Sequence, residues 1–257
     1  MKIHELYFSP TGGTKKVADI LSGGLAEEVL SLDFTDSQVR PESLTLSRED
    51  LALLAVPSYG GRVPAAAARR LAALQGGGAR AVLVCVYGNR AYEDTLLELS
   101  DLARQAGFRV VAAVAAVAQH SILPQYAAGR PDERDRRQLI EFAGQIRAAL
   151  AGELPEPQLP GNRPYRKAGG AALVPKPGKG CDRCGLCARE CPVQAIDPAD
   201  PARVDKAACI SCMRCVRLCP RSARNISPLL RAAAGLALKK SCSARKENDL
   251  FLARPAD

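Results

Sequence analysis

Two cysteine runs of identical spacing constrain this chain more than any other feature. The first run is Cys181, Cys184, Cys187 and Cys191, and the second is Cys209, Cys212, Cys215 and Cys219. Both follow the pattern C-x2-C-x2-C-x3-C-P, so that eight of the ten cysteines lie within forty residues. Thiolate sulfur is a soft ligand, and a 4Fe–4S cube needs one thiolate for each of its four irons. The spacing therefore predicts two 4Fe–4S clusters.

The spacing also predicts which cysteines share a cluster. Two residues between ligands let a tight loop follow three corners of one cube, and the fourth cysteine, which precedes proline, ligates the other cube. We call the two predicted ligand sets the first cluster site (Cys181, Cys184, Cys187 and Cys219) and the second cluster site (Cys209, Cys212, Cys215 and Cys191).

Zinc and disulfides are the alternatives for these cysteines. A zinc site usually combines two C-x2-C pairs, without a third cysteine and a Cys-Pro in each run. A disulfide framework requires an oxidising compartment. The stretch resembles a bacterial two-cluster ferredoxin in all eight cysteines and in both following prolines, Pro192 and Pro220.

No apolar run in the sequence reaches the length needed to cross a bilayer. The longest, Val110 to Ala118, is short and rich in alanine, and Met1 to Phe8 lacks the features of a signal peptide. We therefore expect a cytoplasmic protein in a reducing and oxygen-poor setting, without stable membrane insertion.

The positive charge of the chain lies in its C-terminal part. Residues 1–150 contain 17 basic and 17 acidic residues, whereas residues 151–257 contain 19 and 10. Each oxidised cube with its thiolates contributes about −2, which lowers the excess of that part to about +5. The basic residues are scattered, which favours charge compensation and solvation over a nucleic-acid partner. A zinc-stabilised nucleic-acid module remains a remote alternative.

The N-terminal part alternates short apolar strands with helical patterns. This alternation is typical of a doubly wound parallel α/β sheet with helices on both faces. The expected strands cover residues 3–8, 28–34, 50–56, 81–86 and 108–118, and the later helices cover 65–74, 93–106 and 131–151.

Three unusual loops follow the first, third and fourth expected strands, where ligands bind in such sheets. The first is rich in hydroxyls and glycine, suits a phosphate at a helix N-terminus, and has Lys15 and Lys16 nearby. The other two present aromatic rings among small residues. Together the loops predict a flat, phosphorylated ligand, and flavin mononucleotide (FMN) fits. The candidate residues are Ser9, Pro10, Thr11, Gly12, Gly13 and Thr14; Pro57, Ser58, Tyr59, Gly60 and Gly61; and Tyr87, Gly88, Asn89 and Tyr92.

These loops resemble those of flavodoxins, and the resemblance covers the N-terminal part of the chain. It implies the strand order 2-1-3-4-5, bound FMN and a peptide near Gly60 that can reorient when the flavin gains a proton. The chain has no tryptophan, a common stacking residue of that family. The resemblance then implies that Tyr59 contacts one face of the flavin, and Tyr87 or Tyr92 the other.

The whole chain resembles fusions of a flavodoxin with a ferredoxin. We expect a flavodoxin-like FMN-binding domain at 1–151, a Pro/Gly-rich, semi-stiff linker at 152–172, a small α+β two-cluster ferredoxin domain at 173–228, and a C-terminal helix and tail at 229–257. Leu173 and Val174 are expected to form the first short strand of the ferredoxin domain. The C-terminal helix, residues 229–240, is expected to pack back on a domain instead of lying on a membrane.

Two functions fit this organisation. In the first, the protein passes electrons between the two clusters and FMN, and so couples one-electron and two-electron redox protein partners. In the alternative, a flavin-dependent reductase, the clusters feed FMN, which reduces a small acceptor. Arg62, Arg90 and His120 would then line a substrate site, with His120 as a proton donor near the flavin.

Overall fold

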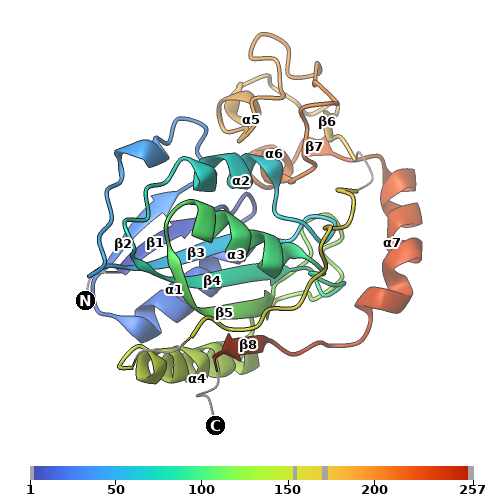
Figure 1. Cartoon of the computed structure of the whole chain (residues 1–257). Coiled ribbons are helices and arrows are strands. Elements are labelled where there is room, and N and C mark those ends of the chain that lie inside the picture. Colours follow the sequence, from blue (N-terminus) through green and yellow to red (C-terminus); the bar gives the residue numbers. More distant parts are fainter. Residues whose placement is uncertain (1–2, 153–154, 170–172, 254–257) are drawn as a thin grey trace.

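A six-stranded sheet forms the centre of the molecule, as Figure 1 shows for a computed structural model that describes residues 3–152, 155–169 and 173–253. The strand order is β2-β1-β3-β4-β5-β8, and the first five strands are parallel. This confirms the expected flavodoxin-like order 2-1-3-4-5. The strands are β1 (Ile3–Tyr7), β2 (Val29–Asp33), β3 (Leu51–Pro57), β4 (Arg80–Tyr87), β5 (Arg109–Val117) and β8 (Asp249–Leu252).

Helices cover both faces of the sheet. Every residue of β3 is buried, as is nearly all of β4, because both strands are continuous apolar runs with a helical layer on each side. One face packs against α1 (Gly13–Leu25) and α4 (Glu133–Ala149), and the other against α2 (Ala65–Ala72) and α3 (Thr95–Gln105). A short 3-10 helix, Pro41–Ser43, follows β2.

The sixth strand comes from the C-terminal tail, which the sequence did not reveal. Strand β8 pairs antiparallel with β5, with Leu252 opposite Ala112 and Asp249 opposite Ala115. The tail is therefore part of the flavodoxin-like sheet, and in Figure 1 it lies beside β5 and α4.

The Pro/Gly-rich segment between the two units is fixed to α3. Two carboxylates hold it: Asp94 accepts hydrogen bonds from the backbone N–H groups of Asn162 (2.9 Å) and Arg166 (2.7 Å), and Asp101 pairs with Arg163 (2.6 Å). The Tyr165 hydroxyl also donates to Asp101. In the described range 155–169, the linker is thus fixed along the flavodoxin-like domain by these contacts.

Replacing Asp94 by alanine is expected to lower the free energy of unfolding by about 2 kcal/mol, because two backbone donors lose a charged acceptor. Hydrogen bonds, first that from Arg166, hold the pKa of Asp94 below its ordinary value. The contribution is therefore present above about pH 4 and is lost as the pH falls through the lowered pKa. Denaturant titration measures the loss, with exposed Asp19→Ala as the control. Equal stabilities of the two variants would contradict this role.

A small cysteine-rich unit lies above the sheet in Figure 1. It contains α5 (Leu186–Arg189), α6 (Arg214–Arg217) and a two-stranded sheet of β6 (Lys176–Pro177) and β7 (Arg224–Asn225). The expected strand at Leu173 and Val174 was wrong, because the first strand of this unit is β6 at Lys176–Pro177, and Leu173 packs before it in an apolar cluster with Met213 and Ile226.

The cysteine-rich unit contacts the flavodoxin-like domain beside α2. Arg70 donates a hydrogen bond to the carbonyl of Pro192 (2.7 Å), and Val193 and Ile210 pack against the apolar core of the sheet domain. None of the helices within residues 3–152, 155–169 and 173–253 has both the length and the apolar character needed to traverse a lipid bilayer.

Helix α7 (Pro228–Cys242) packs back on the protein through small residues instead of its leucines. Gly235 and Cys242 are buried, and the Tyr126 hydroxyl donates to the carbonyl of Gly235 (2.6 Å). Leu229 and Leu236 are 78% and 76% exposed. The expectation that this helix returns to a domain is met.

Candidate functional site

The two cysteine runs fold as a structural repeat. Each residue of the second run lies 28 positions after its counterpart in the first, as Cys209 does after Cys181. Equivalent residues share the left-handed backbone conformation, which is rare outside glycine and tightens a loop around a point. The pairs are Arg183 and Ser211, Gly185 and Met213, and Gln194 and Ser222, with φ between 47° and 75°.

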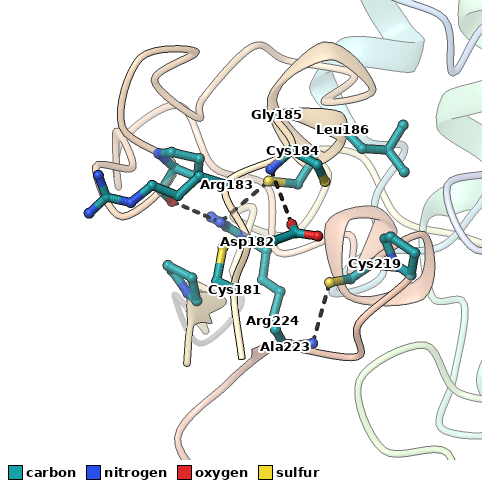
Figure 2. Close-up of a pocket in the computed structure, with 13 residues that line it drawn as sticks. Cys181, Asp182, Arg183, Cys184, Gly185, Leu186, Cys219, Ala223 and Arg224 are labelled. Atoms are coloured by element: carbon teal, nitrogen blue, oxygen red, sulfur yellow. Dashed lines mark hydrogen bonds between the residues drawn. The ribbon is translucent and has the colours of Figure 1, made fainter. Parts of the chain in front are cut away.

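These loops place the cysteines around two cavities. Cys181, Cys184, Cys187 and Cys219 line one of them (Figure 2), and Cys191, Cys209, Cys212 and Cys215 line the other. These are the two sets predicted from the spacing, including the exchange of the fourth cysteine between runs. Within the ranges that the structure describes, no group of three or more His, Cys, Asp or Glu side chains is arranged to hold a single metal ion.

The surroundings of the cysteines suit a bound cluster. The backbone N–H groups of Ala195 and Ala223 each donate to the sulfur four residues earlier, at 3.3 Å, and such bonds stabilise negative charge on sulfur. Burial, in contrast, disfavours the thiolate forms of two ligands, raising the pKa of Cys212 to about 12 and that of Cys215 to about 11, so bound iron would have to displace their protons. All ten cysteines are free thiols in the structure, so that none is withdrawn into a disulfide.

A cavity of about 1120 Å³ opens at the carboxyl ends of the parallel strands. Most of the predicted FMN residues line it: Ser9, Pro10, Thr11, Gly13, Thr14, Pro57, Ser58, Tyr59, Gly60, Tyr87 and Gly88. Its volume is of the order expected for a site that encloses a cofactor. The sheet topology thus brings the three predicted loops to one place.

Two hydroxyls hold the loop of residues 9–14, that of Ser9 within the loop and that of Thr35 after β2. The N–H of Lys15 donates to Ser9 Oγ (2.9 Å), and the N–H of Ser9 donates to Thr35 Oγ1 (2.6 Å). The first turn of α1 has no acidic residue to offset the positive end of the helix dipole. The Lys15 amine, however, forms ion pairs with Glu5 (3.2 Å) and Asp19, so carboxylates of the protein already balance its positive charge.

Four predicted FMN residues lie outside the cavity: Gly12, Gly61, Asn89 and Tyr92. The C-terminal tail explains two of them. Asn89 donates to the carbonyls of Cys242 (2.7 Å) and Ala244 (2.8 Å), and the Tyr92 hydroxyl donates to Asp249 (3.2 Å). The ring of Tyr92 packs on Tyr87, with centroids 5.1 Å apart. Tyr92 thus contacts Tyr87 and the tail, and its stacking on a flavin stays a prediction.

Three segments that no local sequence signal indicated also line the cavity. The linker contributes Arg166, Ala168 and Gly169; helix α7 contributes Ala234, Ala237 and Leu238; and the second cysteine run contributes Cys209, Ile210 and Ser211. Gly60 lies so close to the linker that a Cβ atom there would be 1.9 Å from the carbonyl oxygen of Gly169. A side chain at position 60 therefore does not fit.

Tyr59 lies between the cavity and the second cluster site. It lines the cavity and lies near enough to Cys212 for the two groups to interact electrostatically. Burial raises the pKa of the Tyr59 phenol well above its ordinary value, and Cys212 adds to this effect. Tyr59 thus lines the large cavity and lies near a cysteine of the second cluster site.

The three residues proposed to line a substrate site all line the large cavity, but each also has a partner within the protein. Arg62 binds Glu98 through two nitrogens (2.7 and 2.8 Å), and Arg90 pairs with Glu93. Nδ1 of His120 accepts hydrogen bonds from the next residues of its loop, and burial together with the charge of Arg90 lowers its pKa to about 4. His120 lines the cavity, but at neutral pH its imidazole is uncharged and so is a poor acid.

Comparison with family models identifies the cysteine-rich unit. Residues 180–224 match the 4Fe–4S dicluster domain. The protein joins a flavodoxin-like domain to a 4Fe–4S dicluster domain. The first part of this statement follows from the sheet order, and the second from the match over both cysteine runs.

Solved structures similar to this flavodoxin–ferredoxin fusion include flavodoxins of low sequence identity. One from the domain Archaea is 15% identical, covers 59% of this chain and 100% of its own, and has a TM-score of 0.44. One from Streptococcus pneumonia TIGR4 is 21% identical, with coverages of 58% and 99% and a TM-score of 0.41. One from Fusobacterium nucleatum, bound to flavin mononucleotide, is 18% identical, with coverages of 58% and 95% and a TM-score of 0.38. Curated protein sequences gave no match.

The two domains give the fusion protein an electron-transfer role. Iron–sulfur clusters exchange single electrons and bind through the cysteine pattern present here, and flavodoxin-type domains are flavoproteins. Both belong to redox chemistry, and the partners of such domains are of the redox-protein type.

Proposed function

We propose that this protein passes electrons between two 4Fe–4S clusters and FMN inside one chain. The observation that carries the proposal is the composition of the large cavity, which is lined by the three predicted flavin loops and by Cys209, Ile210 and Ser211 of the second cysteine run. A flavin in that cavity would lie beside a cluster in the second cluster site. Because a cluster carries one electron and FMN can hold two, the arrangement would couple one-electron and two-electron partners.

The FMN-binding residues follow from the lining of the cavity. The phosphate would bind the loop of residues 9–14 at the start of α1, where backbone N–H groups and the helix dipole favour an anion. The flavin ring would lie in the part lined by Tyr59, Gly88 and helix α7. FMN would supply a carrier of one or two electrons there, and α7 and the linker would shield it from water.

The cluster ligands are proposed as the sets Cys181, Cys184, Cys187, Cys219 and Cys191, Cys209, Cys212, Cys215. The first cluster site lies nearer the surface, since Cys184 is exposed whereas Cys191 and Cys212 are buried. We propose that a redox protein exchanges electrons at the first cluster site and that the second cluster site connects it to FMN.

The geometry supports an electron carrier better than a reductase of a small acceptor. Arg62 and Arg90 are engaged in ion pairs, and His120 is held by backbone N–H groups and uncharged. A reductase would need these residues to bind the acceptor and to supply a proton.

Anaerobic preparation of the protein tests the cofactor content. We expect about eight iron, eight sulfide and one FMN per chain, because two cubes and one flavin would be present. In the partly reduced protein, the EPR signal of the flavin semiquinone should relax faster when the second cluster is also reduced. A semiquinone whose relaxation is independent of cluster reduction would contradict a flavin placed beside a cluster.

Cys212→Ala tests the route itself. This variant is expected to slow flavin reduction by a one-electron donor protein at least tenfold, because the second cluster would lose a ligand. Rapid mixing that follows the flavin absorbance measures the rate, and Cys242→Ala, which removes a buried cysteine outside the two runs, is the control. Wild-type rates in Cys212→Ala would exclude the second cluster from the route.

A further inference from the structure

Arg224 occupies a position where the internal repeat otherwise has an apolar residue. It follows the last cysteine of its run by five positions, and its counterpart in the first run is Ile196. Both side chains are buried, with 4% exposure for Ile196 and 3% for Arg224. The second half of the repeat therefore buries a permanent positive charge where the first half buries a hydrocarbon side chain.

The guanidinium of Arg224 lies between the two cysteine sets. Arg224 lines both cavities, and Nη1 is 3.6 Å from the sulfur of Cys187 in the first cluster site. It is also near enough to Cys209 and Cys215 of the second cluster site to act on them electrostatically. Figure 2 shows the side chain rising from beside Ala223 into the space among the cysteines.

Much of this guanidinium has no protein partner. Nη1 donates to the carbonyl oxygen of Pro201 (2.8 Å), but Nε and Nη2 are buried without an acceptor among the residues that the structure describes. Burying a charged donor without an acceptor costs several kcal/mol, and native proteins satisfy such groups. The acceptors for these nitrogens are therefore expected in the cavities that they border.

We propose that Arg224 tunes both 4Fe–4S clusters by donating hydrogen bonds to their sulfur atoms from a position between them. This inference rests on the proposed function, in that it requires clusters in both cysteine sets. Adding one electron makes a cluster more negative, so a buried cation next to it favours the reduced form and raises the reduction potential. Because one guanidinium borders both cavities, it raises both potentials together.

Redox titration of the anaerobic holoprotein, followed by cluster EPR, tests the proposal. Arg224→Ile places the residue of the first half of the repeat in the second half. We expect the reduction equilibrium of each cluster to fall roughly tenfold, a shift of about 59 mV for a one-electron couple. Arg224→Lys keeps the charge and should retain most of both potentials. Arg217→Gln removes an exposed charge from the same domain and should leave them unchanged, because solvent screens it.

Iron and sulfide analysis accompanies each titration. Full iron content with wild-type potentials in Arg224→Ile would overturn the proposal, as would a shift of equal size in Arg217→Gln. If Arg224→Ile loses iron, the iron content of Arg224→Lys decides between the two outcomes. Iron retained in Arg224→Lys would show that the clusters need the positive charge, whereas an equal loss of iron in both variants would overturn the proposal. The potentials do not depend on transfer to FMN, so they stay measurable if the proposed route fails. A wild-type protein without clusters would instead refute the proposed function.

Discussion

Truncation of the chain after Ala244 is expected to destabilise the flavodoxin-like domain by at least about 4 kcal/mol. The truncation would remove β8 from the edge of β5. It would also remove the carbonyl of Lys246, which accepts a hydrogen bond of 2.8 Å from the buried guanidinium of Arg130. Buried polar groups that lose their partners cost about 1–3 kcal/mol each. Since domains are stable by only 5–15 kcal/mol, most of the stability would be lost.

Asn248 contributes much of the stability that the tail provides. It is 4% exposed, its Oδ1 accepts from the N–H of Val117 (2.9 Å), and its amide donates to Asp135 (3.2 Å) and Gln138 (2.8 Å). The side chain joins the end of β5 to the first turn of α4. Asn248→Ala should therefore cost about 2–4 kcal/mol, because it leaves buried donors and acceptors unpaired.

Denaturant unfolding followed by circular dichroism measures both losses. Glu247→Ala is the matched control, since Glu247 is the adjacent residue and only forms a surface pair with Arg134; it should change the stability by less than about 0.5 kcal/mol. A truncated protein as stable as the full chain would show that β8 merely covers the edge of the sheet.

Removal of iron is expected to unfold the segment 180–224 while the sheet domain keeps its structure. The apolar clusters of this unit contain only three or four buried residues each, and its helices and strands are two to four residues long. Such a small core does not offset the loss of chain entropy. Non-glycine residues in left-handed conformation, such as Met213, add strain that metal ligation would have to overcome.

Hydrogen exchange read by mass spectrometry after anaerobic chelation tests this directly. Peptides from 180–224 should lose all protection, whereas those of β3 and β4, which are buried on both faces, should keep theirs. Rebuilding the clusters with iron and sulfide should restore protection and serves as the control. Persistent protection in 180–224 without iron would show that the contacts of the unit, including the one from Arg70 to Pro192, hold it unaided.

The sequence was sufficient wherever the chemistry is local. Cysteine spacing fixes the reach of a loop, so the two cysteine sets, including the exchange of Cys191 and Cys219, could be predicted and are brought together. Because parallel strands end at one edge, the alternation of strands and helices also predicts that the three candidate ligand loops meet there, as they do at the large cavity. The order of the five parallel strands was instead implied by the resemblance to flavodoxins, and the sheet has that order.

The loop after β4 marks the limit of that reasoning. Asn89 and Tyr92 have the residue types of a ligand loop, yet both bind the C-terminal tail more than 150 positions later. The sequence shows which groups of a side chain can donate or accept a hydrogen bond, but it does not show which residue will be the partner. The predicted strand at Leu173 and Val174 failed for a similar reason, since its pairing partner, β7, is distant in the sequence and pairs with Lys176 and Pro177 instead.

Thus the sequence by itself determined the two cysteine sets, the doubly wound sheet and the position of its ligand loops, all of which depend on spacing and periodicity along the chain. Only the tertiary structure decided that the linker and α7 close the large cavity at the strand ends, that the second cysteine run borders this cavity, and that Arg224 lies between both sets of cysteines. These features depend on which distant surfaces bury each other, and that is a property of the packed chain and not of any segment.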